Sequence, residues 1–133
     1  MGTVIRAKIS KSNEYYISKH RYYELKHFCL QYSEWKRELG KLNWFGEKGD
    51  GRSSDPAKPV EWMVERRNEY IKKMEMIEQA ALEADSDIYK YLLKGVTEGL
   101  SYGCLRADGL VCSRDYYYHQ YRRFFYCLSR LRR

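Results

Sequence analysis

The sequence predicts an all-α protein in which a long antiparallel helical hairpin is followed by a C-terminal helix-turn-helix. Apolar residues recur at intervals of three and four in two long segments, which is the spacing of one buried helix face. Glycine, proline and capping residues stand at the ends of these segments. The last third of the chain then reads as a short helix, a tight glycine-containing turn and a longer helix rich in arginine and tyrosine.

The length and charge of the chain limit its class. A chain of 133 residues suggests one compact domain, or a small domain with an appended helical arm. This length suffices for a core without disulfides or metals. Of the net charge of +7, residues 101–133 supply +5, from seven Arg and two Asp. A basic end on an otherwise balanced chain indicates a polyanionic partner, nucleic acid or membrane. Arginine forks onto phosphates and guanine edges, so its dominance here favours nucleic acid.

The cysteines and the apolar runs give no sign of a metal site or a membrane segment. Zinc sites usually need closely paired ligands, and the chain has no CxxC. A site built from Cys104, Cys112 and His119 is therefore the minor alternative to reduced, mostly buried thiols in a cytosolic protein. We expect no metal and no cofactor. The N-terminal residues lack the apolar core of a signal peptide, and no apolar run is long enough to span a membrane.

The first periodic segment predicts a long helix over residues 18–39, with Gly40 as its stop. Residues 1–16 before it are expected to form a flexible N-terminal arm, and residues 1–13 could alternatively add a short strand. The buried stripe of the helix is expected to consist of Tyr22, Leu25, Phe28, Cys29, Tyr32, Trp35 and Leu39.

Residues 40–58 hold four Gly and one Pro and show no periodicity. We therefore predict a long, mobile loop. Trp44 and Phe45 within it have two interpretations. They either anchor the loop onto the helices or, as the less common case, contact a partner.

Asp55 followed by Pro56 predicts the start of a second long helix, because an acidic cap and a proline suit the first turn. Arg67 interrupts its stripe, which suits a position next to solvent or to a second subunit. Two amphipathic helices of similar length are expected to pack as an antiparallel hairpin over residues 17–84, and a homodimer through this hairpin is a further option. The stripe is expected to consist of Val60, Met63, Tyr70, Ile71, Met74, Ile77 and Ala81.

A third helix is predicted over residues 87–98, with Gly99 as its stop. The helix-turn-helix follows it, within the region 85–133. Serine caps and an Asp-Gly turn predict it locally. We expect a cap at Ser101, a short helix over 102–107, a turn at Asp108-Gly109, a second cap at Ser113 and a long helix to about Arg130.

Helical spacing divides the last helix into two faces. The face expected to turn inward carries Tyr117, Tyr121, Phe124, Leu128 and Leu131, with Phe125 at its edge. The opposite face is cationic and hydrogen-bonding and carries Asp115, His119, Arg122, Tyr126 and Arg130, with Arg123 beside them.

The outward face suits a DNA major groove. The helix N-terminus would lie closest to base edges, with Arg114 able to read guanine and Asp115 able to accept from cytosine. The side chains expected nearest the bases are Arg114, Asp115, Tyr118 and His119. The phosphate contacts would come from Arg122, Arg123, Arg130, Arg132 and Arg133, and from the helix starts at Ser101 and Ser113. An ordinary solvated surface is the alternative, and structured RNA is an alternative ligand.

The residues LLKGVTEGLSYGCL…CSRDYYYHQYRRFF resemble the helix-turn-helix of sigma-factor region four. More narrowly, DIYKYLLKGVTEG and the aromatic YxxYRRFF run are similar to phage late-gene transcription regulators of the ArpU/RinA type, over about residues 85–131. The resemblance implies a bacterial host cytoplasm, double-stranded DNA as partner and an optional contact with RNA polymerase. Ser113, Arg114 and Asp115 would start the recognition helix. The turn between Leu105 and Ser113 is one residue longer than the usual sigma-like spacing, which affects the register in the groove.

Three function classes follow. The first is a sequence-specific DNA-binding transcriptional regulator of phage or prophage origin, with a recognition helix over 113–130. The alternative is a phage packaging or assembly protein, similar to a small terminase, that combines a helix-turn-helix with an oligomerising hairpin. An enzyme is not expected, because no convergent His/Asp/Ser or Cys/His set, phosphate-binding glycine loop or metal spacing occurs.

Overall fold

The computed structural model describes residues 13–48 and 61–133, and all of their side chains except those of residues 44–48. This part of the chain is helical and contains no strand, which confirms the predicted all-α fold. The helices are α2 (Lys19–Leu30), α3 (Tyr32–Lys48), α4 (Glu61–Ala84), α5 (Tyr89–Glu98), α6 (Tyr102–Ala107) and α7 (Arg114–Leu131).

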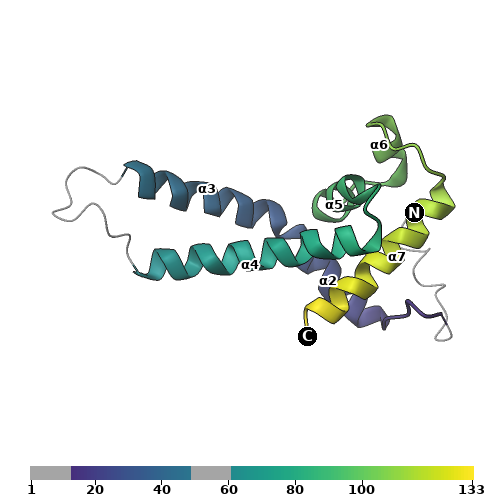
Figure 1. Cartoon of the computed structure of the whole chain (residues 1–133), viewed down its shortest axis with the longest axis horizontal. Coiled ribbons are helices and arrows are strands. Elements are labelled where there is room, and N and C mark those ends of the chain that lie inside the picture. The colour runs from purple at the N-terminus through teal and green to yellow at the C-terminus, as the bar shows by residue number, and fades with distance from the viewer. Residues whose placement is uncertain (1–12, 49–60) are drawn as a thin grey trace.

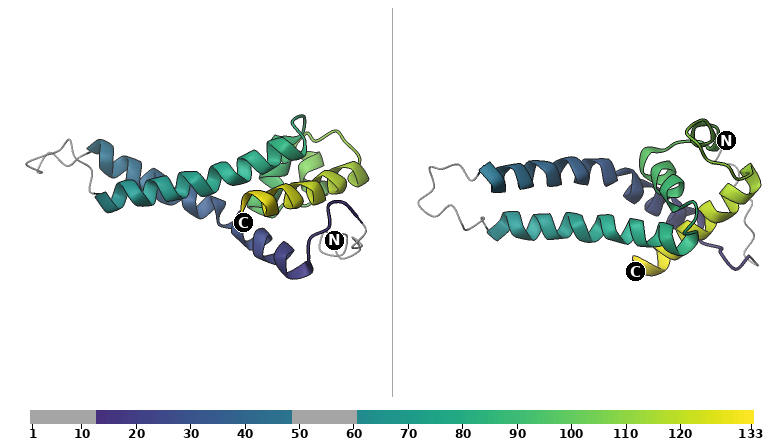
Figure 2. Two further views of the ribbon diagram at one scale, coloured as in Figure 1. Left: turned by 60° about the horizontal axis from the view of Figure 1, so that its bottom comes forward. Right: turned by 45° about the horizontal axis from the view of Figure 1, so that its top comes forward.

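Two long helices form an arm that projects from a cluster of shorter ones. In Figure 1, α3 and α4 lie side by side and run in opposite directions, as they also do in the right view of Figure 2. Helices α2, α5, α6 and α7 gather at one end of this arm. Helix α7 packs across the C-terminal half of α4 and also contacts α2 and α5.

The single helix predicted over residues 18–39 is in fact two helices, which break at Gln31. The Gln31 amide donates to the carbonyl of Phe28 at 3.2 Å, a tighter turn than that of an α-helix. The break bends the chain without exposing its apolar stripe. The ring of Phe28 before it still packs edge-on against Trp35 after it, at 5.0 Å between centroids.

The expected helix stop at Gly40 is wrong, since α3 continues through it to Lys48. A glycine ends a helix by adopting positive φ, but among the described glycines only Gly99 and Gly109 do so. Gly40 costs the helix about 1 kcal/mol, which the contacts of α3 along α4 outweigh. The predicted loop is therefore helical over 40–48, and its remainder lies outside the described residues. Other predictions also lie outside them: the side chains of Trp44 and Phe45, the helix start at Asp55-Pro56, Val60 and residues 1–12.

Helix α4 ends at Ala84 as predicted and is buried only in its second half. Its buried residues Ile77, Ala80, Ala81 and Ala84 are mostly small, which lets α7 approach closely. None of the residues 61–76 is buried, because this part of α4 packs mainly along α3 (Figure 1). Arg67, which interrupts the stripe, is exposed and donates to the side-chain oxygen of Asn43 on α3 at 3.0 Å.

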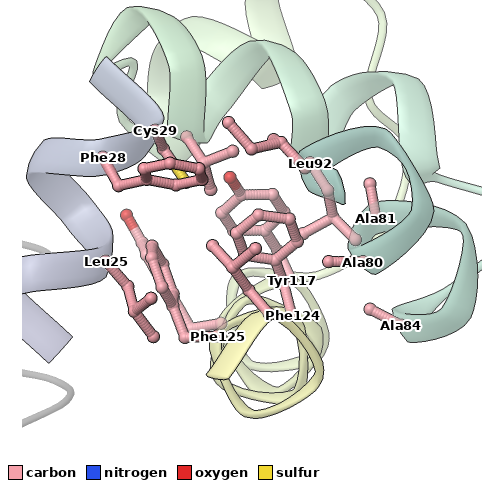
Figure 3. Packing of buried hydrophobic residues seen from close by; sticks show 14 of the residues in the cluster. Leu25, Phe28, Cys29, Ala80, Ala81, Ala84, Leu92, Tyr117, Phe124 and Phe125 are labelled. Atoms are coloured by element: carbon pink, nitrogen blue, oxygen red, sulfur yellow. The ribbon is translucent and has the colours of Figure 1, made fainter. Parts of the chain in front are cut away.

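The core lies where α2, α4, α5 and α7 meet. Figure 3 shows Phe124, Phe125 and Tyr117 of α7 between the α2 side chains and the alanines of α4. The aromatic rings meet edge to face, for example Phe124 with Phe125 at 4.9 Å, an arrangement that aromatic pairs favour. The largest fully buried side chains are Tyr117, Phe124, Phe125, Leu25, Ile77, Leu92, Leu105, Leu128 and Cys29.

A buried carboxylate joins the end of α4 to α7. Asp85, 9% exposed, accepts from the amides of Asp87 and Ile88 at 2.8 and 3.2 Å. It also accepts from the Gln120 amide at 2.8 Å and from the Tyr116 hydroxyl. Burial raises the pKa of Asp85, but these four hydrogen bonds outweigh it and hold the pKa below its ordinary value.

Replacing this carboxylate is expected to destabilise the fold in a pH-dependent way. Asp85→Asn is expected to lower the free energy of unfolding at pH 7 by about 2 kcal/mol. The charge-assisted hydrogen bonds become neutral ones, and the NH2 group of the new asparagine side chain faces groups that are themselves donors. A depressed pKa contributes stability above the unfolded value near 3.9, and this stability is lost as pH falls through the folded value. Urea unfolding should therefore show a gap between the two proteins that narrows below about pH 4. Asp87→Asn, exposed in the same turn, is the control, and an equal loss there would contradict the expectation.

Candidate nucleic-acid interface

The local signals that predicted α6, the turn and α7 are all present. The hydroxyl of Ser101 accepts from the Cys104 amide at 3.3 Å and caps α6. The hydroxyl of Ser113 accepts from the Tyr116 amide at 3.2 Å and caps α7. Gly109 takes a φ of +118° in the turn between them, a conformation that glycine adopts without strain.

The turn is held from both sides. Leu110 is 3% exposed, and its amide donates to the Leu105 carbonyl at 3.0 Å. The Tyr102 hydroxyl donates to the carbonyl of Cys112 at 2.6 Å, and the ammonium of Lys94 on α5 pairs with Asp108. Val111 in this turn is turned outward and is 95% exposed.

The N-terminal end of α7 presents a set of exposed polar side chains. Arg114, Asp115, Tyr116 and His119 are all exposed. The guanidinium of Arg114 lies over the ring of Tyr102 on α6, 5.3 Å from its centroid. Stacking of this kind limits the rotamers of a long side chain while leaving its donors free. Arg114 is therefore held in place at the exposed N-terminal end of α7.

Tyr118 does not belong to this set, although it was expected among the residues nearest the bases. Its side chain is 5% exposed, its hydroxyl accepts from the Tyr102 amide at 3.4 Å, and its ring packs against Tyr117 and Tyr121. A side chain so placed cannot reach a base edge.

The buried arc of α7 is wider than the predicted stripe because three helices surround it. Tyr117, Phe124 and Leu128 are buried as expected, and Tyr121 is half-buried. Gln120 is buried as well, at 7% exposure. Leu131 was expected to face inward but is 39% exposed, in the last turn of α7.

Beyond Arg114, the arginines of α7 lie at its middle and at its C-terminal end. Arg122 and Arg123 are half-buried near the middle, and burial lowers the pKa of Arg122 while the charge of Asp115 partly offsets this. Arg130 lies over the ring of Tyr126 at 5.8 Å, about 24 Å along the helix from Arg114 at 1.5 Å per residue. Figure 1 shows this end of α7 beside α4, at the opposite end of the helix from α6.

The last two arginines differ from each other. Arg132 lies over the ring of Phe28 at 4.1 Å, and its carbonyl accepts from the guanidinium of Arg21. Arg21 also donates to the hydroxyl and the carbonyl of Ser129, each at 3.1 Å. Arg132 is thus part of the contact that fastens α2 to the end of α7, whereas Arg133 is exposed.

Tyr15 lies on the outward face of α7, which the helical periodicity does not indicate. Its ring packs edge-on against His119 at 5.7 Å and Tyr126 at 5.5 Å, and the guanidinium of Arg123 lies over it at 5.9 Å. The Tyr15 amide donates to the Asn13 side chain at 2.7 Å. The described end of the predicted N-terminal arm therefore covers the middle of the face that was expected to meet DNA.

The structure adds one cation to the candidate interface. Arg106, in the last turn of α6, is exposed and precedes the α6–α7 turn that contains Val111. Its position on the helix that precedes the turn is the signal that could have identified it, because that helix crosses the phosphate backbone in helix-turn-helix complexes.

The described residues contain no group of three or more His, Cys, Asp or Glu side chains arranged to hold a metal ion. Within the same ranges, 13–48 and 61–133, no helix combines the length and the apolar character that crossing a bilayer would need. Comparison of the chain with protein-family models, with curated proteins and with solved structures gave no match.

Proposed function

We propose that the chain is a sequence-specific DNA-binding transcriptional regulator that reads the major groove with the N-terminal end of α7. One observation carries the proposal: Arg114, Asp115 and His119 are all exposed within the first two turns of a capped helix. The rest of that helix is anchored in the core through Tyr117, Phe124 and Leu128. The surrounding region, residues 101–133, carries a net charge of +5.

The contacts divide into base-reading and phosphate-binding ones. Arg114 would donate its two-pronged guanidinium to a guanine, and Asp115 would accept from a cytosine. Arg106 on α6, with Arg122 and Arg123 on α7, would lie near phosphates. Arg130 lies about 24 Å along α7 from Arg114 and Arg133 follows the end of the helix, so we assign neither to this stretch of groove. Arg132 is engaged with Phe28. We therefore place the interface at the N-terminal half of α7, with the α6–α7 turn.

The biological setting rests on the sequence. The resemblance of residues 85–131 to ArpU/RinA-type late-gene regulators supports a phage or prophage origin, a bacterial cytoplasmic location and a contact with RNA polymerase.

Selection of binding sites from random double-stranded DNA tests function and specificity together. We expect one enriched motif, bound with an affinity that falls steeply with salt because Arg contacts displace counterions from phosphates. An RNA hairpin of the same length serves as competitor. Absence of enrichment together with absence of binding at low salt would overturn the proposal, and preferential binding of the hairpin would assign the face to structured RNA.

Tyr15 gives a second way to examine the face. Because its ring occupies the surface at His119, Arg123 and Tyr126, Tyr15→Ala is expected to raise the affinity for DNA. Aromatic contacts of this kind contribute about 0.5–1.5 kcal/mol, so the dissociation constant should fall by about 2- to 10-fold. Fluorescence anisotropy with a labelled duplex measures the change. Tyr23→Ala is the matched control on α2, and a loss of affinity in Tyr15→Ala alone would instead place Tyr15 on the DNA.

A packaging or assembly protein similar to a small terminase is the second candidate, which the projecting α3–α4 arm favours (Figure 1). Neighbouring arms could join such subunits into a ring, whereas a regulator of this kind is expected to be a monomer or a dimer. Light scattering on the full chain separates the two, because a ring has a mass of many chains.

A further inference from the structure

The surface at α4 and the end of α7 carries two partly exposed leucines. Leu82 on α4 is 43% exposed and Leu131 on α7 is 39% exposed. Both line a shallow hollow of about 490 Å³. Leu131 also lines a second hollow, of about 140 Å³, that continues this surface beside α7. We call this surface the α4–α7 face, and its residues are Glu75, Met76, Glu78, Gln79, Leu82, Glu83, Cys127, Arg130, Leu131 and Arg133.

The leucines have an unusual setting for solvated residues. Leu82 stands on the side of α4 opposite its buried alanines, where helical spacing should place a polar residue. It is surrounded there by charged and polar neighbours, and Leu131 follows on the adjacent helix. An apolar centre with a polar rim is the arrangement found in protein contact sites.

The charges on the rim are separated by helix. The α4 side is acidic, through Glu75, Glu78 and Glu83, and the α7 side is basic, through Arg130 and Arg133. The Glu78 carboxylate accepts from the Tyr32 hydroxyl at 2.5 Å, and Glu83 lines the smaller hollow together with the two arginines. A two-fold axis through the centre of such a face brings the acidic side of each copy opposite the basic side of the other. Among possible partners, a second copy of this chain is therefore electrostatically matched to the face.

We propose that the α4–α7 face binds a second copy of the chain and forms a symmetric dimer. Leu82 and Leu131 of the two copies meet around the axis, and Arg130 and Arg133 of one copy face the acidic row of the other. This assigns to Arg130 and Arg133 a role in association instead of phosphate contact. The dimer surface lies on the second half of α4, beside the core, and not on the distal arm.

The dimer also has a consequence for DNA recognition, which rests on the proposed function. The face lies at the C-terminal end of α7, about 24 Å along the helix from Arg114, so dimerisation leaves the proposed reading end open. Two such ends related by a two-fold axis would read two half-sites of a palindrome. The selected DNA motif should then be an inverted repeat.

Analytical ultracentrifugation of the full chain without DNA tests the dimer independently of DNA binding. We expect a mass of two chains of 16.1 kDa. Leu82→Glu should raise the dimer dissociation constant by about tenfold or more, and the variant should fold, because the position is exposed. Val64→Glu is the matched control, since Val64 is 38% exposed on the distal arm and lies outside the face.

A charge-reversal pair tests the orientation. Arg130→Glu with Arg133→Glu gives a face that is acidic on both sides, and Glu75→Lys with Glu83→Lys gives one that is basic on both sides. Each variant alone should be monomeric, and an equimolar mixture should form a heterodimer. Circular dichroism confirms that both are folded before they are mixed.

Three results would overturn the dimer: a wild-type chain that stays monomeric at its solubility limit, a ring-sized mass, or dissociation by Val64→Glu but not by Leu82→Glu. The last would move the contact to the arm. Because the measurement contains no DNA, a monomer that still selects a DNA motif refutes only this inference, whereas a dimer that selects none refutes only the proposed function.

Discussion

Gly95→Ala is expected to lower the free energy of unfolding by about 2–3 kcal/mol, although the same exchange within a helix usually raises it by about 1 kcal/mol. A Cβ added at Gly95 would overlap the hydroxyl oxygen of Tyr117 and lie 3.1 Å from a methyl group of Leu105. Tyr117 and Leu105 are 1% and 0% exposed. Neither can move aside without disturbing the contact of α5 with α6 and α7. Urea unfolding followed by circular dichroism measures the change.

Gly40→Ala is the matched control, because Gly40 also lies inside a helix. No atom lies within 4 Å of its added Cβ. The exchange should therefore show the ordinary helix preference and stabilise the protein by about 0.5–1 kcal/mol. Opposite signs at the two positions would demonstrate that the close approach of Tyr117, and not helix propensity, requires the glycine at position 95.

Tyr117→Phe identifies the atom responsible. The Tyr117 hydroxyl is buried without a hydrogen-bond partner, and burial raises its pKa. Removing it should be neutral or stabilising by about 1 kcal/mol, since a buried unsatisfied hydroxyl is costly. The same change removes the oxygen that the new Cβ would meet. Gly95→Ala should thus cost much less in the Tyr117→Phe background, and an unchanged cost there would place the strain at Leu105 instead.

The parts of the fold that the sequence predicts to the residue are those that depend on neighbours along the chain. The hydroxyls of Ser101 and Ser113 cap helices by accepting from amides three residues ahead, and the Asp108-Gly109 turn ends α6 through the positive φ of Gly109. Local chemistry therefore predicts α6 and the start of α7. Gly99 ends α5 for the same reason, at a φ of +71°.

The features that the sequence does not predict depend on partners remote in the chain. Whether Gly40 ends a helix depends on α4, which holds α3 in place beyond it. Tyr118 and Gln120 are buried because α7 has three helical neighbours, which a two-faced pattern does not anticipate. The contact of Tyr15 with His119 joins opposite ends of the chain, and no periodicity reports it. As a result, the predicted reading end of α7 is exposed in the structure, while Tyr15 covers the middle of its outward face.

Arg114→Ala is expected to weaken binding to the selected duplex by about 5- to 100-fold, the range for loss of one two-pronged arginine–guanine contact. Arg66→Ala provides an unusually close control. Arg66 is exposed on α4 and lies over the ring of Trp62 at 5.6 Å, as Arg114 lies over Tyr102 at 5.3 Å. Both exchanges remove one charge and one stacked guanidinium, so only position relative to the proposed interface distinguishes them.

A second variant distinguishes a contact of Arg114 with a base from a contact with a phosphate. Arg114→Lys keeps the charge but loses the fork, so it should retain affinity for unrelated DNA while losing preference at one base pair of the motif. If Arg114 binds a phosphate instead, Arg114→Ala weakens all sequences equally and lowers the slope of affinity against salt by about one ion, whereas Arg114→Lys changes little. Equal losses in Arg114→Ala and Arg66→Ala would contradict both versions, because binding would then follow net charge and not the end of α7. The lysine variant thus decides whether this end of the helix reads DNA or only holds it.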